Sequence, residues 1–400
     1  MRFRYSTKEN GRLVKKAAVY TRDEHKINFV DVDNQAVYII ERLQANGYES
    51  YVVGGAVRDL ILGKKPKDFD IVTAANPSRI KKIFRNARII GRRFRLVHVF
   101  FGPKIFEVST FRSIKDGHTS NTFGTIEEDV RRRDFSLNAL FYDPLQQLVI
   151  DYVGGMKDIK KRRIQPLIEL PSIFTDDPVR MIRAAKYAAV ADFRIPLSLR
   201  WRIYKHAALL ADISPSRLTE EIFKIIHSPR ALEIVMCLDS LKIYRYLQPQ
   251  AAELFKTRSG FKDKYLKSVS ALKPEDLKPG EAIAAIIRDY LEDIVDWDGS
   301  KSSNDELNPS SRSVTERYKN AFMLARKFVL PMNPPRVELD SAIRLLFAEH
   351  GVTVKKAHFH ERLIRKNAME GKPALAAAEK DKPPQKRRKR RKRTAKIINE

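Results

Sequence analysis

The distribution of apolar residues changes along the chain near Ile164. Before this point, short apolar runs alternate with short stretches of helical periodicity, and beyond it helical periodicity dominates. Residues 34–48 show the helical pattern well, because apolar side chains recur at Val37, Ile40 and Leu43. The chain is therefore predicted to be α+β, with a mixed sheet in the first part and only helices in the second.

The first part is predicted to alternate strands and helices. Asn76 and Pro77 are typical of a helix start, and Gly102-Pro103 predicts a hairpin turn. The predicted strands are residues 51–53, 69–73, 95–101, 105–110 and 148–152, the predicted helices are 57–62 and 77–84, and the run 135–142 is mostly apolar.

The second part is predicted to be helical, with a polar loop at 296–311 and a disordered tail after about residue 366. Its predicted helices are 178–190, 197–210, 217–227, 231–241, 280–294, 313–328 and 337–349. The chain is thus divided into an arm (1–34), a mixed domain (35–160), two helical regions (161–255 and 256–365) and a tail (366–400).

The charge balance of the chain indicates a polyanionic partner. Lys and Arg number 77 against 49 Asp and Glu, which gives a net charge of +28. Nucleic acid is the first candidate partner for such a chain. Residues 386–393 are eight consecutive cations and contribute only part of this excess.

Cysteine usage and hydropathy are typical of a cytoplasmic protein. Cys237 is the single cysteine, so no disulfide framework or multi-cysteine zinc site can form within the chain, as suits a reducing cytoplasm. No apolar run approaches about 18 residues, so no membrane span is expected. Arg2 and Arg4 precede no apolar segment of the kind that a secretory signal has.

Two aspartates suggest a metal site. Asp68 and Asp70 lie two apart on a predicted strand, so their side chains should share a face and could bind Mg²⁺. Gly54 and Gly55 stand between a predicted strand and a predicted helix, where the backbone can approach a phosphate closely. The alternative is a pair of surface aspartates at a strand end.

A third carboxylate is a candidate for the same site. Glu107 lies in the predicted strand 105–110, between Phe106 and Val108. A charge inside a strand is costly if it is buried without a partner, so a metal would explain it. A glutamate that simply faces water is the alternative.

An arginine cluster is the next candidate site. Arg131, Arg132 and Arg133 precede Asp134, and guanidinium groups match triphosphate oxygens well. Asp134 could accept hydrogen bonds from ribose hydroxyls, and Asn138 lies in the apolar run that follows. The alternative is a basic loop in solvent.

The start of the predicted helix 178–190 carries a possible base-reading motif. Asp177 is expected to cap this helix, with Arg180 and Arg183 on one face. A carboxylate can accept from an exocyclic amine while a guanidinium donates to ring acceptors, a pattern that suits adenine or cytosine. A capped helix with surface charges is the alternative.

Two basic segments are candidate RNA contacts. Residues 89–99 combine Arg92, Arg93 and Arg95 with an aromatic residue, although a basic hairpin edge would look the same. The tail could bind RNA without sequence preference or could serve only solubility. Its cluster is Lys386, Arg387, Arg388, Lys389, Arg390, Arg391, Lys392 and Arg393. His358 and His360 are expected to be surface residues, because histidines two apart do not share a helix face.

Together these segments resemble the class II tRNA nucleotidyltransferase and bacterial poly(A) polymerase family, within the polymerase β-like nucleotidyltransferase superfamily. The resemblance is strongest over roughly residues 46–194. The segments that carry it read, in chain order, GGAVRD, KDFDIVT, IFEVSTFR, RRRDFSLNAL, DYVGGMKDI and DDPVRMIRA, and SRLTEEIFKII is similar to the family's helical neck.

The resemblance implies a nucleotidyltransferase head followed by an all-helical neck and body and a disordered basic tail. It implies two Mg²⁺ ions on Asp68 and Asp70, which are catalytic together with Glu107. It also implies an incoming base held by Asp177 and Arg180, with Arg183 beside them. The expected nucleotide-binding residues are Gly54, Gly55, Arg58, Arg112, Arg132, Arg133, Asp134, Asn138, Asp177, Arg180 and Arg183.

Within the family, residues 89–99 and the arginine-rich end are more similar to poly(A) polymerases than to CCA-adding enzymes. The resemblance therefore implies template-independent transfer of AMP from ATP to RNA 3′ ends. CCA addition to tRNA is the first alternative, and a noncatalytic RNA-binding protein that has kept the fold is the second. A cytoplasmic monomer is expected, with RNA-decay proteins as further candidate partners.

Overall fold

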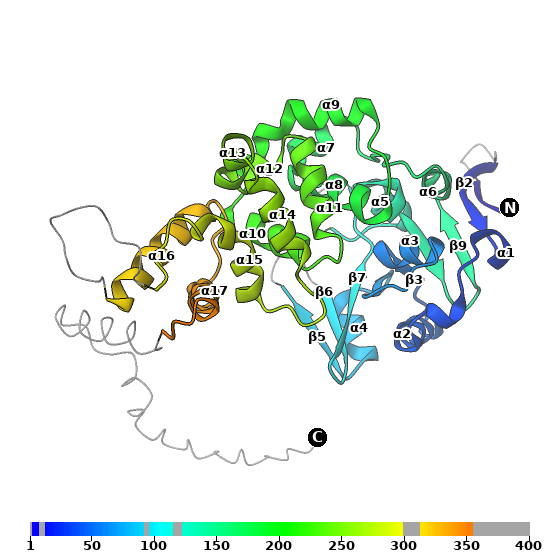
Figure 1. Cartoon of the computed structure of the whole chain (residues 1–400). Coiled ribbons are helices and arrows are strands. Elements are labelled where there is room, and N and C mark those ends of the chain that lie inside the picture. Colours follow the sequence, from blue (N-terminus) through cyan, green and yellow to red (C-terminus); the bar gives the residue numbers. More distant parts are fainter. Residues whose placement is uncertain (1, 8–12, 92–95, 115–121, 299–312, 355–400) are drawn as a thin grey trace, which may run out of the picture. The chain divides into compact units, whose positions relative to one another are not determined.

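The computed structural model describes residues 2–7, 13–91, 96–114, 122–298 and 313–354 (Figure 1). Contacts divide the chain into two units. One unit comprises residues 1–295 and 321–346, and the other comprises 296–320 and 347–400. The polar loop and the basic tail predicted from the sequence lie almost entirely outside the described residues.

A nine-stranded mixed sheet occupies the first part of the larger unit. Its strand order is β1-β2-β9-β8-β3-β4-β7-β6-β5. Only β4 and β7 pair in parallel, and all other described neighbours are antiparallel. The strands are β1 (Arg2–Thr7), β2 (Leu13–Tyr20), β3 (Ser50–Val53), β4 (Asp70–Thr73), β5 (Ala87–Ile90), β6 (Leu96–Phe101), β7 (Lys104–Thr110), β8 (Leu140–Asp143) and β9 (Leu148–Asp151).

The first residues of the chain belong to this sheet. Strand β2 pairs with β9, from Ala18 opposite Asp151 to Tyr20 opposite Val149. Because Ala17, Ala18 and Val19 are buried, these strands extend the sheet, whereas the sequence predicted an arm. The pattern missed them because charged residues interrupt the apolar alternation.

Strand β4 begins one residue later than the sequence predicted. Strand β4 starts at Asp70, so Asp68 lies in the irregular segment before it, and the prediction that both aspartates share a strand was wrong. Asp68 and Asp70 are exposed and Phe69 between them is buried, so the alternation of an extended chain still holds. The hairpin at Gly102-Pro103 is confirmed by β6 and β7.

Local capping explains where the helices of this region begin. Asp33 accepts a hydrogen bond from the Gln35 amide at 2.8 Å and caps α2, and Asn76 caps α4 with Pro77 in its first turn. The sequence predicted both helices. The helical elements here are α1 (Arg22–His25), η1 (Phe29–Asp31), α2 (Asn34–Ala45), α3 (Gly55–Ile61), α4 (Pro77–Ile83), α5 (Ile126–Arg131), η2 (Ser136–Asn138) and α6 (Gly155–Lys160).

The rest of the described chain is helical, as predicted. The sequence did not predict the helices between residues 244 and 270. The helices are α7 (Ser172–Asp176), α8 (Val179–Ala191), α9 (Leu197–His206), η3 (Ala207–Asp212), α10 (Pro215–Ile226), α11 (Ala231–Ser240), α12 (Tyr244–Leu247), α13 (Pro249–Thr257), α14 (Phe261–Ser270), α15 (Pro279–Leu291), α16 (Val314–Phe328) and α17 (Arg336–Glu349). None of the described helices is long and apolar enough to cross a membrane.

The smaller unit has a compact aromatic cluster of its own. The Trp297 ring stacks on His350 with centroids 4.8 Å apart and meets Phe347 edge-on at 5.1 Å. Arg317 donates to the Trp297 carbonyl oxygen at 3.1 Å. These contacts join residues far apart in the sequence into one packed group.

Candidate active site

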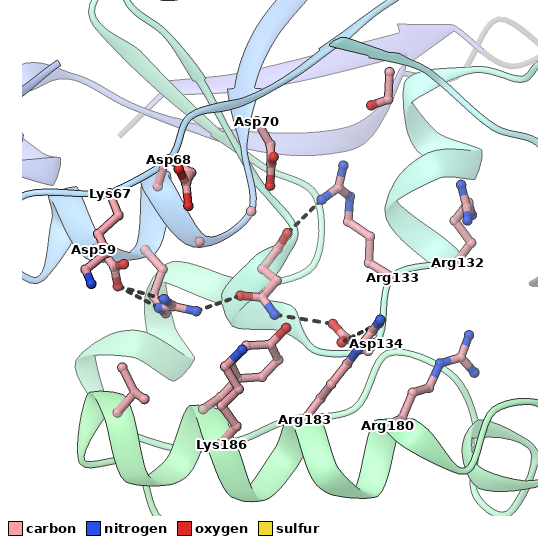
Figure 2. Close-up of a pocket in the computed structure, with 18 of the residues that line it drawn as sticks. Asp59, Lys67, Asp68, Asp70, Arg132, Arg133, Asp134, Arg180, Arg183 and Lys186 are labelled. Carbon is pink, nitrogen blue, oxygen red and sulfur yellow. Dashed lines mark hydrogen bonds and ion pairs between the residues drawn. The ribbon is translucent and has the colours of Figure 1, made fainter. Parts of the chain in front are cut away.

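A cavity of about 1220 Å³ lies in the larger unit, between the sheet region and helices α8 and α10 (Figure 2). Its wall contains nearly all the described residues that the sequence marked as catalytic or nucleotide-binding. These are Gly54, Gly55, Arg58, Asp68, Asp70, Arg112, Arg132, Arg133, Asp134, Asn138, Asp177, Arg180 and Arg183. A concave site into which charged and polar side chains converge is the first candidate for an active site.

The two aspartates stand at the sheet side of the cavity. Neither accepts a hydrogen bond from the described residues, and both are exposed to the solvent within the pocket. Asp70 reaches this solvent from inside a concave wall, and loss of hydration there, followed by the charges of Glu107 and Asp68, raises the pKa of Asp70 to about 6. Crowded carboxylates of this kind favour a cation beside them.

The glycine pair allows the backbone to approach Asp70. Gly54 has a φ of +71°, which a side chain would disfavour, and a Cβ atom there would lie 3.7 Å from Asp70 Oδ2. Helix α3 begins at Gly55, directly after this turn. The main chain at Gly54 is therefore close to the Asp70 carboxylate.

Glu107 lies beside the site rather than in its wall. It is on β7, which pairs in parallel with β4, and its charge contributes to the raised pKa of Asp70. Its carboxylate is half exposed and lies 3.6 Å from His98 Nε2.

The predicted RNA contacts Arg92, Arg93 and Arg95, like the basic cluster of the tail, lie outside the described residues.

The donor set fits a divalent cation that is shared with a substrate. No group of three or more potential ligands converges among the described residues. Mg²⁺ however is commonly held by one or two carboxylates together with substrate phosphates. Asp68 and Asp70 could supply these oxygens, because both line the cavity and neither has a hydrogen-bond partner within the described chain.

The arginines form an electropositive wall opposite the aspartates. Burial, followed by the charge of Arg112, lowers the pKa of Arg132 to about 10. Its Nε is buried and makes no hydrogen bond within the described chain. Arg133 is fixed by Asp129 at 2.8 Å and by the Asn138 carbonyl oxygen at 3.0 Å. Guanidinium groups that repel one another in this way are suited to receive an anion.

A chain of hydrogen bonds holds the floor of the cavity. Arg58 Nη1 donates to Asn138 Oδ1 at 3.1 Å, and Asn138 Nδ2 donates to Asp134 Oδ1 at 3.4 Å. Arg58 also pairs with Asp59 at 2.8 Å, and Arg183 lies 3.8 Å from Asp134. Arg58 and Asn138, predicted to bind nucleotide, are therefore largely engaged with neighbouring side chains.

Asp177 has a partner that the sequence did not reveal. Its Oδ1 accepts from the amide of Val179, the first residue of α8, at 3.1 Å, although Pro178 rather than Asp177 occupies the N-cap position that the sequence predicted for Asp177. Arg217 Nη2 contacts both of its oxygens at 2.8 Å. Arg180 donates to the Ile173 carbonyl oxygen at 3.1 Å and lines the same cavity as Asp177.

The sequence also missed Lys186 and Tyr187, which line the cavity from α8. Lys186 follows Arg183 by three residues, so helical spacing was a signal for it. Burial lowers its pKa. Arg217 had no comparable signal, because it lies 40 residues beyond Asp177 in the sequence.

The architecture is that of an α+β nucleotidyltransferase. The structure is similar to the CCA-adding enzyme of Bacillus stearothermophilus in complex with CTP, with a TM-score of 0.52 and 27% identity over 85% of this chain and 88% of that one. A tRNA-processing enzyme with a TM-score of 0.53 and 21% identity has the same fold.

Two family models match the chain. Residues 50–165 match the poly A polymerase head domain, and residues 192–255 match a probable RNA and SrmB-binding site of polymerase A. Residues 50–165 and 192–255 are therefore similar to the family that contains poly(A) polymerases and CCA-adding enzymes.

The curated relatives include both kinds of enzyme. Poly(A) polymerase I of Salmonella typhi is 42% identical over 253 residues, which cover 59% of this chain and 54% of that protein. The CCA-adding enzyme of Geobacillus thermodenitrificans is 38% identical over 225 residues, with 55% of each chain covered. The chain thus spans about half the length of the curated relatives it matches.

Proposed function

We propose that this protein is a template-independent polynucleotide adenylyltransferase that adds AMP from ATP to RNA 3′ ends and releases pyrophosphate. The observation that carries the proposal is the cavity itself, where two aspartates without hydrogen-bond partners in the described chain face an arginine wall. The identity to poly(A) polymerase I, which is 42% for the Salmonella typhi protein, supports adenylation in particular.

Asp68 and Asp70 would hold two Mg²⁺ ions, with Glu107 near enough to influence the site. Such ions supply activation of the attacking 3′-hydroxyl and stabilisation of the leaving pyrophosphate. Both carboxylates would hold the ions on the same side, because they project from one side of an extended segment next to Gly54.

The arginine wall would hold the triphosphate. Arg112, Arg132 and Arg133 line the cavity, and the buried Nε of Arg132 has no partner in the described chain. A phosphate oxygen would satisfy this donor and relieve the repulsion between the guanidinium groups. Asp134 lies between this wall and Arg183, where it could accept from a ribose hydroxyl.

Asp177 would read the base. Its Oδ1 already accepts two hydrogen bonds, whereas Oδ2 contacts only Arg217 among the described residues. A carboxylate oxygen can accept more than one bond, so Oδ2 can still accept from an exocyclic amine. Arg180 and Arg183 on the same helix would donate to the acceptors of the ring. Adenine and cytosine both meet this pattern.

CCA addition to tRNA is the second candidate, favoured by the structural similarity to a CCA-adding enzyme in complex with CTP.

Primer extension distinguishes a poly(A) polymerase from a CCA-adding enzyme. Purified full-length protein with Mg²⁺ receives labelled generic RNA or tRNA that lacks its CCA end, with ATP, CTP or both. Long ladders on generic RNA with ATP alone are expected. Addition that needs CTP and stops after three nucleotides on tRNA would contradict the proposal.

Substitution of Asp70 tests the proposed metal site. Asp70→Ala is expected to lower incorporation at least 100-fold, because a metal ligand is lost, while binding of RNA in a filter assay persists. Activity close to that of the unchanged protein would exclude Asp70 as a ligand.

The proposed function also gives each segment of the chain a role. We place a catalytic head in residues 35–160, and strands β1 and β2 of residues 1–34 extend its sheet. A neck in 161–255, an RNA-binding body in 256–365 and the tail 366–400 follow. The protein would act as a monomer in the cytoplasm, in mRNA processing that promotes decay, and RNA-decay proteins are candidate partners.

A further inference from the structure

Helix α9 has apolar residues on two opposite faces. Leu199 and Ile203 are buried on the inner face, where α9 packs against α7 and η3. Leu197, Trp201 and Tyr204 on the outer face are 83%, 55% and 61% exposed. These three are spaced four and three residues apart, so they form one continuous stripe. In Figure 1 this helix lies at the upper edge.

Cations surround this stripe. The Arg202 guanidinium lies 5.1 Å and the Lys205 ammonium 5.3 Å from the centre of the Trp201 ring, and Arg200 is exposed beside it. No acidic residue occurs between Asp192 and Asp212. None of the three cations forms a salt bridge within the part of the chain that the structure describes.

We propose that the stripe Leu197, Trp201 and Tyr204 is a stacking platform for single-stranded RNA upstream of the 3′ end. This inference rests on the proposed function, because it adds a second contact to the same substrate. Aromatic faces bind bases of any sequence, and neighbouring cations bind the phosphates between them. The stripe extends about 10 Å along the helix, the length of about three stacked nucleotides.

The charge of the surface favours RNA over a protein partner. Every charged residue between Asp192 and Asp212 is a cation, so the surface around the stripe complements a polyanion. The helix also lies inside residues 192–255, which match the family model described as a probable RNA and SrmB-binding site. A protein occupant or a second copy of the chain is an outcome that the test must separate.

The two tryptophans of the chain give a direct readout. Trp297 is 5% exposed, so Trp297→Phe leaves Trp201 as the only reporter. Titration of full-length Trp297→Phe protein with a 15-nucleotide oligoadenylate, without ATP or Mg²⁺, should quench the Trp201 fluorescence. In the otherwise unchanged protein, Trp201→Ala with Tyr204→Ala should weaken binding of this RNA about tenfold or more.

Further variants separate stacking from simple apolar contact and from misfolding. Trp201→Phe should retain most of the affinity and Trp201→Leu should lose it, because only the first keeps an aromatic face. Tyr38→Ala removes an exposed tyrosine from α2 and should change nothing. Unchanged thermal melting would show that the variants fold.

Three results would overturn the inference: no quenching at saturating RNA, full affinity in Trp201→Leu, or a change in oligomeric state without a change in RNA affinity. The last would indicate a second copy on this face. Because the assay needs no catalysis, a protein that quenches but adds no AMP would contradict the proposed function alone. A protein that extends RNA without quenching would contradict only the platform.

Discussion

At the scale of single residues, the donors around each carboxylate of the cavity decide what it can still bind. Asp70 accepts no hydrogen bond within the described chain, and its raised pKa reflects burial and neighbouring carboxylates. Asp177 is held by the Val179 amide and by Arg217. The first is suited to a cation, and the second is oriented for a specific hydrogen bond.

Arg217 is expected to act by positioning Asp177. Arg217→Ala removes the contacts at 2.8 Å to both carboxylate oxygens. It should raise KM for ATP about tenfold, by analogy with the loss of a hydrogen bond to a charged group, with a smaller change in kcat. Steady-state extension assays at varied ATP would measure both constants.

A comparison of variants tests this role. Arg217→Ala should add little to Asp177→Asn, because the two residues act as one unit. Arg230→Ala removes a similar guanidinium that pairs with Asp192 at 2.9 Å and does not line the cavity, so KM should stay unchanged. Additive effects in the double variant would show that Arg217 acts independently of Asp177.

At the scale of elements, a buried aspartate joins β9 to α6. Asp151 Oδ1 accepts from the Val153, Gly154 and Gly155 amides at 2.8–3.0 Å, and Oδ2 accepts from the Met156 amide at 3.0 Å. These bonds satisfy the free amides at the start of the helix. The helix thereby approaches η2, which precedes strand β8.

Gly155→Ala should destabilise this junction. A Cβ atom at Gly155 would overlap the Ser136 carbonyl oxygen, and backbone cannot give way as a flexible side chain can. The expected loss is about 1–3 kcal/mol of unfolding free energy, typical of overpacking. Denaturant unfolding would measure it. Lys157→Ala on the exposed side of α6 is the control, and an equal effect there would remove the steric explanation.

At the scale of the whole molecule, the cavity depends on contacts between segments that are distant in sequence. Lys64 donates to the Val190 carbonyl oxygen at 3.1 Å, and Arg183 reaches Asp134. The whole chain also carries a net charge of +28. Affinity for RNA is therefore expected to depend strongly on salt.

Deletion of residues 384–400 tests the contribution of the basic tail. The affinity for RNA should fall, and the plot of log affinity against log salt should become shallower by about 0.7 for each phosphate that the shortened protein no longer neutralises. Fluorescence anisotropy at several salt concentrations would measure this slope. Deletion of 394–400 alone retains the cluster and should have little effect. An equal fall in affinity in both deletions would exclude the cluster as the RNA-binding element.

Local signals predicted much of the site. The caps at Asp33 and Asn76, the glycine pair before α3 and the carboxylate at the start of α8 all act within a few residues of sequence. Asp68 and Asp70 could be recognised because their spacing and flanking residues are local as well. Even the misplaced start of β4 left their common orientation intact.

The sequence by itself determined the order of the α/β and helical regions, the paired aspartates and the arginine cluster, because these follow from backbone preferences and side-chain chemistry over short spans. Only the tertiary structure decided that β2 extends the sheet, that Arg217 holds Asp177, and that an aromatic face of α9 stays exposed. Such pairings depend on how distant segments pack, and no local pattern encodes that.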